Sequence, residues 1–98
     1  MKIFIQNSFV KFDKDMVAAH ELTIENVFVQ KNKRSEGIGR DLVERVLNYA
    51  KKSNYKTVGL FAEPQTDDGL EVDDLIEFYQ SCGFRSDGDC SELMTYTI

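Results

Sequence analysis

Several features are scarce or missing in this 98-residue sequence, and each absence excludes a class of protein. No apolar run approaches the ~20 residues that cross a bilayer, so we expect neither a membrane-spanning helix nor a membrane partner. The N-terminal segment MKIFIQNSFV lacks the apolar core and cleavage site of a signal peptide, because Gln6, Asn7 and Ser8 interrupt it. With no repeat, linker or targeting signal, the sequence predicts a single cytoplasmic domain over residues 1–98.

Cysteine and histidine are also scarce, which limits thiol and metal chemistry. The two cysteines, Cys82 and Cys90, form no Cys-x-x-Cys pair, and His20 is the only histidine. A structural zinc site needs four such ligands, so we expect no metal. Without a secretion signal, both thiols are expected to be reduced. A nucleophilic pair of one cysteine with His20 is left as an alternative.

The residues that are present indicate a folded chain with unevenly placed charge. Apolar residues make up 42% of the sequence, which is typical of a globular protein. Residues 31–56 carry eight basic and three acidic side chains, whereas residues 57–98 carry one basic and ten acidic side chains. The basic segment favours a small anionic ligand, and the acidic half argues against nucleic acid. Two solvated faces would explain the same pattern.

Hydrophobic periodicity predicts several strands and one irregularity within them. Strands are expected at residues 1–7, 9–13, 21–30, 56–62 and 93–98. The segment 9–13 could continue the first strand or pair with it. In the third segment the apolar positions change parity at Glu25 and Asn26, which predicts a β-bulge there. Residues 14–20 fit a short helical turn or a loop equally well.

Two helices are predicted between the later strands. The first has its apolar residues on one stripe from Ile38 to Ala50 and ends before Ser53. The second is expected to be capped by Asp73 or Asp74 and to end at Gly83. The fold class is therefore α/β, with a mixed sheet. Antiparallel N-terminal strands are followed by a β-α-β-α-β order that contains a right-handed crossover.

The segment before the first helix is suited to a pyrophosphate. Gly37 and Gly39 allow a ligand to approach the backbone closely, and the first helical N–H groups have no partner within the helix. Arg34 and Arg40 add positive charge. The segment is not a P-loop, and Leu42 stands where a Rossmann fingerprint needs its third glycine. A tight turn eased by glycine is the alternative explanation.

Two motifs together resemble the GNAT superfamily of N-acetyltransferases. The segment from Arg34 to Gly39 is similar to that family's acetyl-CoA motif, Gln/Arg-x-x-Gly-x-Gly/Ala. The segment from Phe78 to Phe84, FYQSCGF, is similar to its Leu/Phe-Tyr-x-x-x-Gly-Phe helix end. The resemblance covers residues 21–98. It implies a truncated GNAT-like fold in which two parallel strands, one ending at Val29 and one at 57–62, splay apart.

The resemblance also implies a cosubstrate and a reaction. The protein would be an acetyl-CoA-dependent transferase that passes an acetyl group to an amine, on a small molecule or a protein, by direct attack. In the family, pantetheine inserts into the splay and pairs with the backbone of the first strand, here Val27, Phe28 and Val29. The pyrophosphate would be held by the loop and the helix start, through residues that match the motif: Arg34, Glu36, Gly37, Ile38, Gly39 and Arg40.

Two residues are the leading candidates for proton transfer. Tyr79 matches the family's general acid, which protonates the leaving thiolate, although packing between aromatic neighbours would also explain it. Glu25 is the first candidate for the base because it is nearest the expected splay. Glu21, Glu63 and His20 are further candidates for that role.

Some positions depart from the family pattern and keep other functions open. Val72 stands where many relatives have asparagine, and Glu36 where many have a basic residue. These departures favour a non-catalytic GNAT-like module that binds CoA or a protein. The acidic half alone suggests an interaction protein for basic partners. The short chain leads us to expect a cofactor half better preserved than the acceptor half, and exposed sheet edges would allow a homodimer.

Overall fold

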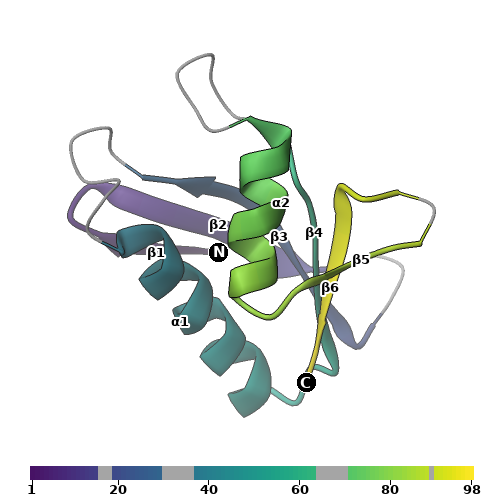
Figure 1. Ribbon diagram of the computed structural model, residues 1–98. Helices are drawn as coiled ribbons and strands as arrows, with labels where there is room; N and C mark the ends of the chain where they lie inside the picture. Colours follow the sequence, from purple (N-terminus) through teal and green to yellow (C-terminus); the bar gives the residue numbers. More distant parts are fainter. Residues whose placement is uncertain (16–18, 30–36, 64–70, 89) are drawn as a thin grey trace.

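The computed structural model describes residues 1–15, 19–29, 37–63, 71–88 and 90–98 (Figure 1). Strands and helices follow one another in the order β1 (Lys2–Ile5), β2 (Ser8–Lys14), β3 (Glu21–Phe28), α1 (Ile38–Lys52), β4 (Thr57–Phe61), α2 (Val72–Ser81), β5 (Arg85–Ser86) and β6 (Leu93–Thr97). Neither helix of this described part is long and apolar enough to cross a membrane.

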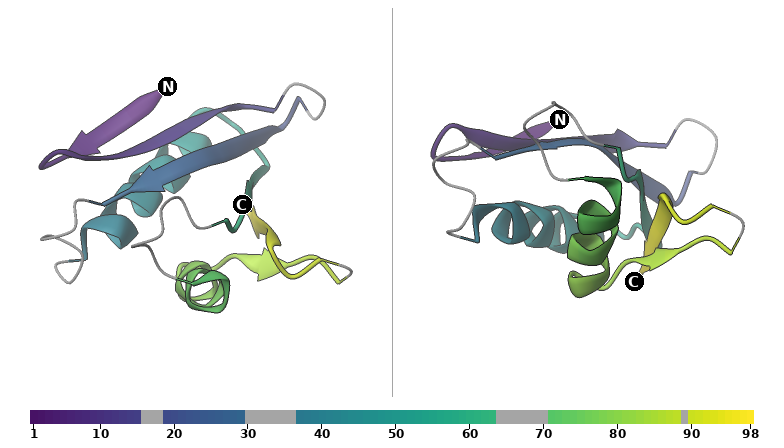
Figure 2. Two further views of the ribbon diagram at one scale, coloured as in Figure 1. Left: turned by 90° about the horizontal axis from the view of Figure 1, so that it is seen from above. Right: turned by 45° about the horizontal axis from the view of Figure 1, so that its top comes forward.

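The described strands form one mixed sheet in the order β1-β2-β3-β4-β6-β5. The strands β1, β2 and β3 are antiparallel, β3 and β4 are parallel, and β6 runs antiparallel to both β4 and β5. Both helices lie on the same side of this sheet (Figure 2). The predicted fold class, a mixed sheet with antiparallel N-terminal strands and one parallel pair, is confirmed.

The core lies between α1 and the sheet. The predicted stripe on α1 is confirmed, because Ile38, Leu42, Val43, Val46, Leu47 and Ala50 are all buried. They pack with buried side chains of four strands and the segment after α2, namely Val10, Phe12, Leu22, Ile24, Val58, Leu60, Phe84 and Met94. Lys51 and Lys52 lie in the last turn of α1, where positive charge complements the helix dipole.

The predicted bulge in β3 is also confirmed. Lys11 of β2 pairs with Asn26, and the next residue, Phe12, pairs with Ile24, so the register skips Glu25. The extra residue keeps apolar side chains on the helix side of the sheet both before and after it. Without it, Val27 would face the opposite side from Ile24, and one of the two would leave the core.

The start of α2 differs from the prediction, whereas its end agrees with it. Glu71, not Asp73 or Asp74, occupies the N-cap position and makes no side-chain capping bond. The two aspartates lie in the first turn, where a carboxylate is stabilised by the positive helix end without capping it. The predicted end at Gly83 is confirmed by its positive φ of 102°.

The turn after α2 is a Schellman motif. The N–H of Gly83 donates to the carbonyl of Gln80, and the N–H of Phe84 donates to the carbonyl of Tyr79, both at 3.0 Å. The aromatic rings of Tyr79 and Phe84 pack with centroids 5.8 Å apart, which supplies the apolar contact that accompanies this motif. This turn therefore fixes Tyr79 relative to the strands that follow.

Some strand boundaries, and one additional strand, differ from the sequence prediction. The first strand ends at Ile5, because Gln6 and Asn7 both have positive φ and form a two-residue hairpin turn. β2 extends to Lys14, which settles the start of the ambiguous segment, while residues 16–18 lie outside the described part. The two-residue strand β5 was not predicted, because so short a segment carries no periodicity.

Candidate functional site

The parallel strands β3 and β4 separate from each other at one end. Their register runs from Glu21 opposite Thr57 to Ile24 opposite Leu60, and β3 then continues to Phe28 beside β2. Beyond Leu60, the N–H of Ala62 donates to the carbonyl of Glu92 at 2.7 Å, so β4 continues beside the segment that leads into β6. We call the divergence of β3 and β4 beyond this last pair the splay. It is where the sequence resemblance placed it.

Three elements meet next to the splay, at the start of α1. A Cβ atom built on Gly39 would lie 3.4 Å from Cζ of Phe78 on α2 and 3.4 Å from Cγ2 of Val29 at the end of β3. Glycine at this position thus lets the first turn of α1 approach both neighbours closely. The structure brings the predicted residues Val29 and Gly39 together and adds Phe78, whose role here was not predicted.

Gly37 shapes the N-terminus of α1. It has φ 77° and ψ 12°, a left-handed conformation, and its carbonyl accepts the first helical hydrogen bond, from the Asp41 N–H at 3.1 Å. The amides of Ile38, Gly39 and Arg40 therefore have no acceptor one turn earlier in the helix. Among the described residues, a Cβ on Gly37 would meet nothing within 4 Å. Together with the helix dipole, this arrangement suits an anion.

The conformation of Gly37 gives a prediction that needs no ligand. Gly37→Val should lower the free energy of unfolding by about 1–2 kcal/mol, because a β-branched residue is strained at positive φ. Gly37→Asn should cost less, since asparagine tolerates this region and no described residue would lie within 4 Å of its Cβ. Urea denaturation of the two variants tests this. Equal losses would show that conformation is not what selects glycine here.

The Arg40 side chain joins the two helices. Its guanidinium donates to the carbonyl of Ser81 at 3.1 Å and to Oγ of Ser81 at 2.6 Å, which ties the first turn of α1 to the last turn of α2. Because the guanidinium is bonded to Ser81, the backbone N–H of Arg40 is the group left for the predicted role in holding an anion. The positive charge of the side chain still lies near the start of α1. The other two predicted residues of the motif, Arg34 and Glu36, lie outside the described residues.

Tyr79 is buried in α2, with its ring edge-on to those of Phe78 and Phe84 at centroid distances of 5.2 and 5.8 Å. Burial, with a smaller contribution from Cys82, raises the pKa of Tyr79 to about 12. The phenol consequently keeps its proton at neutral pH and can act as a donor but not as a base. Its neighbour in the chain, Phe78, lies close to Gly39 at the start of α1.

The candidate bases fall at two different ends of the sheet. Glu25 lies on the bulge at the splay, and its carboxylate is 3.6 Å from Nζ of Lys11. Glu63 lies two residues beyond the end of β4, at the same end of the sheet as the splay. Glu21 accepts a hydrogen bond from Thr57 Oγ1 at 3.2 Å at the opposite end, where the His20 carbonyl also accepts the N–H of Lys56. The structure therefore favours Glu25 and Glu63 over the other two.

The cysteines show no sign of nucleophilic activation. Burial raises the pKa of the Cys82 thiol, which opposes formation of a thiolate. The Cys90 thiol donates to the Glu92 carboxylate at 3.4 Å. Among the described residues, no group of three or more His, Cys, Asp or Glu side chains is placed to hold a metal ion.

Comparison with known proteins identifies the fold. The family profile of the acetyltransferase (GNAT) domain matches residues 5–86. The crystal structure of the anti-CRISPR protein AcrVA5 is 32% identical, with a TM-score of 0.83, and the match covers 99% of this chain and 97% of that one. Among curated proteins, none matches the sequence.

More distant solved structures share the fold at lower identity. Tetrahymena GCN5 is 16% identical with a TM-score of 0.72, over 98% of this chain and 66% of that one. The PaiA N-acetyltransferase of Thermoplasma acidophilum, in complex with coenzyme A, is 17% identical with a TM-score of 0.69, over 93% and 53%. The chain thus spans only about half to two thirds of the length of these two proteins.

Proposed function

Since the chain belongs to the GNAT acetyltransferase family, we propose that it is an N-acetyltransferase that uses acetyl-CoA to acetylate an amine. The observation that carries this proposal is the start of α1, where Gly37 is the N-cap of a helix whose first amides have no acceptor within the helix, and Gly39 lies against β3 and α2. An anionic ligand bound there would lie beside the splay, where the acetyl group would have to be.

The residues present fit acetyl-CoA in two places. The amides of Ile38, Gly39 and Arg40 would hold the pyrophosphate at the positive end of α1. The β3 edge from Val27 to Val29 lies beyond the last β3–β4 pair. Its N–H and C=O groups toward the splay would pair with the amides of pantetheine, as a neighbouring strand does. Arg34 and Glu36 would complete the loop.

The residues of the chain would assist the reaction by moving protons. When bound, acetyl-CoA supplies the acetyl group as an activated thioester. Tyr79, whose raised pKa keeps it protonated at neutral pH, would donate its phenolic proton to the sulfur as the carbon–sulfur bond breaks. Glu25 would accept the proton that the amine nitrogen loses as the new carbon–nitrogen bond forms. The products are an acetamide and a free thiol.

A binding and turnover experiment tests the proposal. Acetyl-CoA at 100 times its Kd should stabilise the protein by ~2.7 kcal/mol, measured as a shift of the thermal unfolding curve. Free thiol should then be released on addition of an amine. Gly39→Leu is the variant expected to lose binding, because a large side chain at the α1–α2–β3 junction should abolish the shift. The absence of a shift with the unaltered protein would contradict acetyl-CoA binding.

A non-catalytic module is the second candidate function. Two features favour it: Tyr79 is almost fully buried, and Val72 begins α2 where many relatives carry asparagine. Such a module would bind acetyl-CoA and show the thermal shift, yet release no thiol with any amine. The same experiment therefore separates the two candidates.

The mass of the protein in solution, measured by light scattering, would test the expected homodimer.

A further inference from the structure

One buried oxygen at the splay has no hydrogen-bond partner. Within the described residues, Oδ1 of Asn26 is the buried side-chain nitrogen or oxygen atom that lacks a partner. Asn26 follows the bulge residue Glu25 and lies two positions beyond Ile24, the last residue of β3 that pairs with β4. Buried polar atoms are nearly always paired, so an unpaired acceptor at this position calls for an explanation.

We propose that Asn26 is the residue that positions the acceptor amine, with Oδ1 accepting a hydrogen bond from an aliphatic primary amine. The amine would enter the splay from the face of the sheet opposite the helices. Because Oδ1 is buried, the Asn26 side chain would turn toward the splay as the amine enters. This inference rests on the proposed acetyltransferase function and assigns it a positioning residue.

The strand registers place Asn26 on that opposite face. Asn26 pairs with Lys11, which lies between the buried residues Val10 and Phe12 and therefore faces away from α1. On β4, Phe61 lies between buried Leu60 and Ala62, and so faces the same way as Asn26 and Lys11. Asn26 and Phe61 thus flank the splay on the side that α1 and α2 leave uncovered.

Phe61 adds an apolar surface to this side of the splay. It pairs with Leu93 of β6, and the two side chains are 56% and 45% exposed. This exposed pair would offer an apolar surface to the methylene groups of a ligand. An aliphatic amine presents such groups behind its nitrogen.

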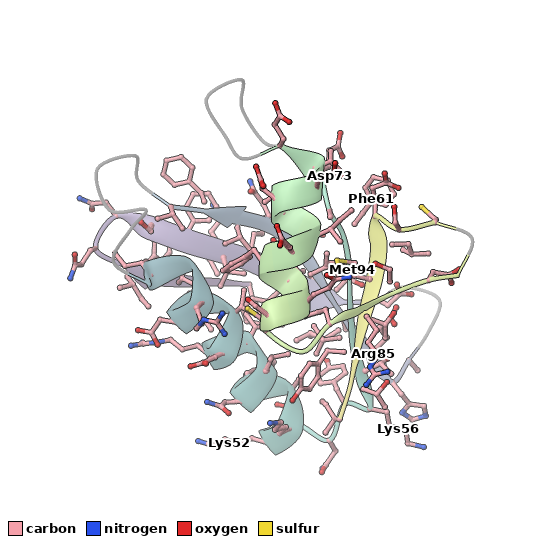
Figure 3. The ribbon with its side chains drawn as sticks, viewed as in Figure 1. Lys52, Lys56, Phe61, Asp73, Arg85 and Met94 are labelled. Atoms are coloured by element: carbon pink, nitrogen blue, oxygen red, sulfur yellow. The ribbon has the colours of Figure 1, made fainter. Side chains whose placement is uncertain are left out.

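Several described carboxylates lie at this end of the molecule. Figure 3 shows Asp73, in the first turn of α2, at the same end as Phe61. Glu63 follows β4, and Glu92 precedes β6 with its carbonyl bonded to Ala62. Lys11 offsets the charge of Glu25, but Arg85 is the only basic residue from 57 to 98. These carboxylates would attract an alkylammonium ion to the splay.

A neutral amide oxygen suits this role better than a carboxylate would. Asparagine accepts an N–H hydrogen bond without carrying charge, so it orients the amine and leaves it able to lose its proton. An aspartate at the same position would stabilise the ammonium form and raise the pKa of the amine. The attacking nitrogen must be uncharged, so that change would favour binding and oppose reaction.

Steady-state kinetics of three variants test the proposal, with 1,5-diaminopentane and a lysine-containing peptide as alternative acceptors. Asn26→Leu should raise the KM for the amine at least tenfold and leave the Kd for acetyl-CoA unchanged. Asn26→Asp should lower the KM for the amine, lower kcat and shift the rate profile to higher pH. Asn48→Leu, on the exposed face of α1, is the control and should change none of these values. The preferred acceptor distinguishes a protein lysine from a free diamine.

Other results would overturn it. A weaker Kd for acetyl-CoA in Asn26→Leu would assign Asn26 to the cosubstrate, and unchanged kinetics in both variants would leave it a structural residue. Titration of ¹⁵N-labelled protein with 1,5-diaminopentane separates this inference from the proposed function. A shifted Asn26 side-chain signal without thiol release would support the amine site and contradict catalysis. An unshifted signal in an active enzyme would contradict the amine site alone.

Discussion

Replacement of Tyr79 by phenylalanine is expected to lower kcat by at least ~100-fold, the usual contribution of a positioned general acid. The change removes only the hydroxyl group, and the edge-on contacts of the ring with Phe78 and Phe84 persist. The thermal midpoint and the Kd for acetyl-CoA should therefore remain close to those of the unaltered protein. Stopped assays of thiol release, together with calorimetry, measure all three quantities.

The pH dependence provides a second test of Tyr79. Its pKa is raised to about 12, so its titration should not reduce kcat between pH 7 and pH 10. Between pH 10 and pH 12 the unfolded chain releases this proton and the folded chain keeps it, so stability should fall as pH rises. Tyr79→Phe should lack that part of the fall. Tyr96→Phe, which alters another ring packed on Phe84, is the control and should retain activity.

Replacement of Gly83 by alanine is expected to cost about 2–3 kcal/mol of folding free energy. Two effects combine at this position. The φ of 102° is unfavourable for any residue with a side chain, and a Cβ atom would lie 2.8 Å from Cε2 of Tyr96. The Tyr96 ring cannot move away easily, because it packs against Phe84 and lies beneath the ammonium group of Lys51.

Gly88→Ala is the matched control for Gly83→Ala. A Cβ on Gly88 would meet nothing within 4 Å, and its φ is not in the positive range, so the loss should be small. Urea denaturation of both variants measures the difference. If Gly83→Ala unfolds at the same urea concentration as Gly88→Ala, the Schellman motif does not hold Tyr79 in place as described.

The sequence predicted best those features that depend on neighbours in the chain. The stripe on α1, the bulge at Glu25 and the helix end at Gly83 all follow from local periodicity or from one residue's backbone preference. The predicted N-cap of α2 was wrong. Glu71, Asp73 and Asp74 are close together, and a carboxylate is favourable at several positions near a helix start, so the first helical residue is not determined by them.

The parts of the site that join distant segments could not be predicted. The bond from Arg40 to Ser81 spans 41 positions, and no local pattern indicates it. The separation of Glu21 from Glu25 follows from where β3 and β4 stop pairing, which only the register reveals. From the sequence, Asn26 could be assigned only to the predicted bulge. That its Oδ1 lacks a hydrogen-bond partner is visible only in the folded chain.

The junction of α1 with α2 has a consequence for the order of events in folding. The hairpin of β1 and β2 closes over two residues and can form early, whereas the contacts of Arg40 with Ser81 require both helices to have docked. The ligand site would then be completed after the main folding barrier. A ligand bound at this junction should slow unfolding and leave the rate of folding almost unchanged.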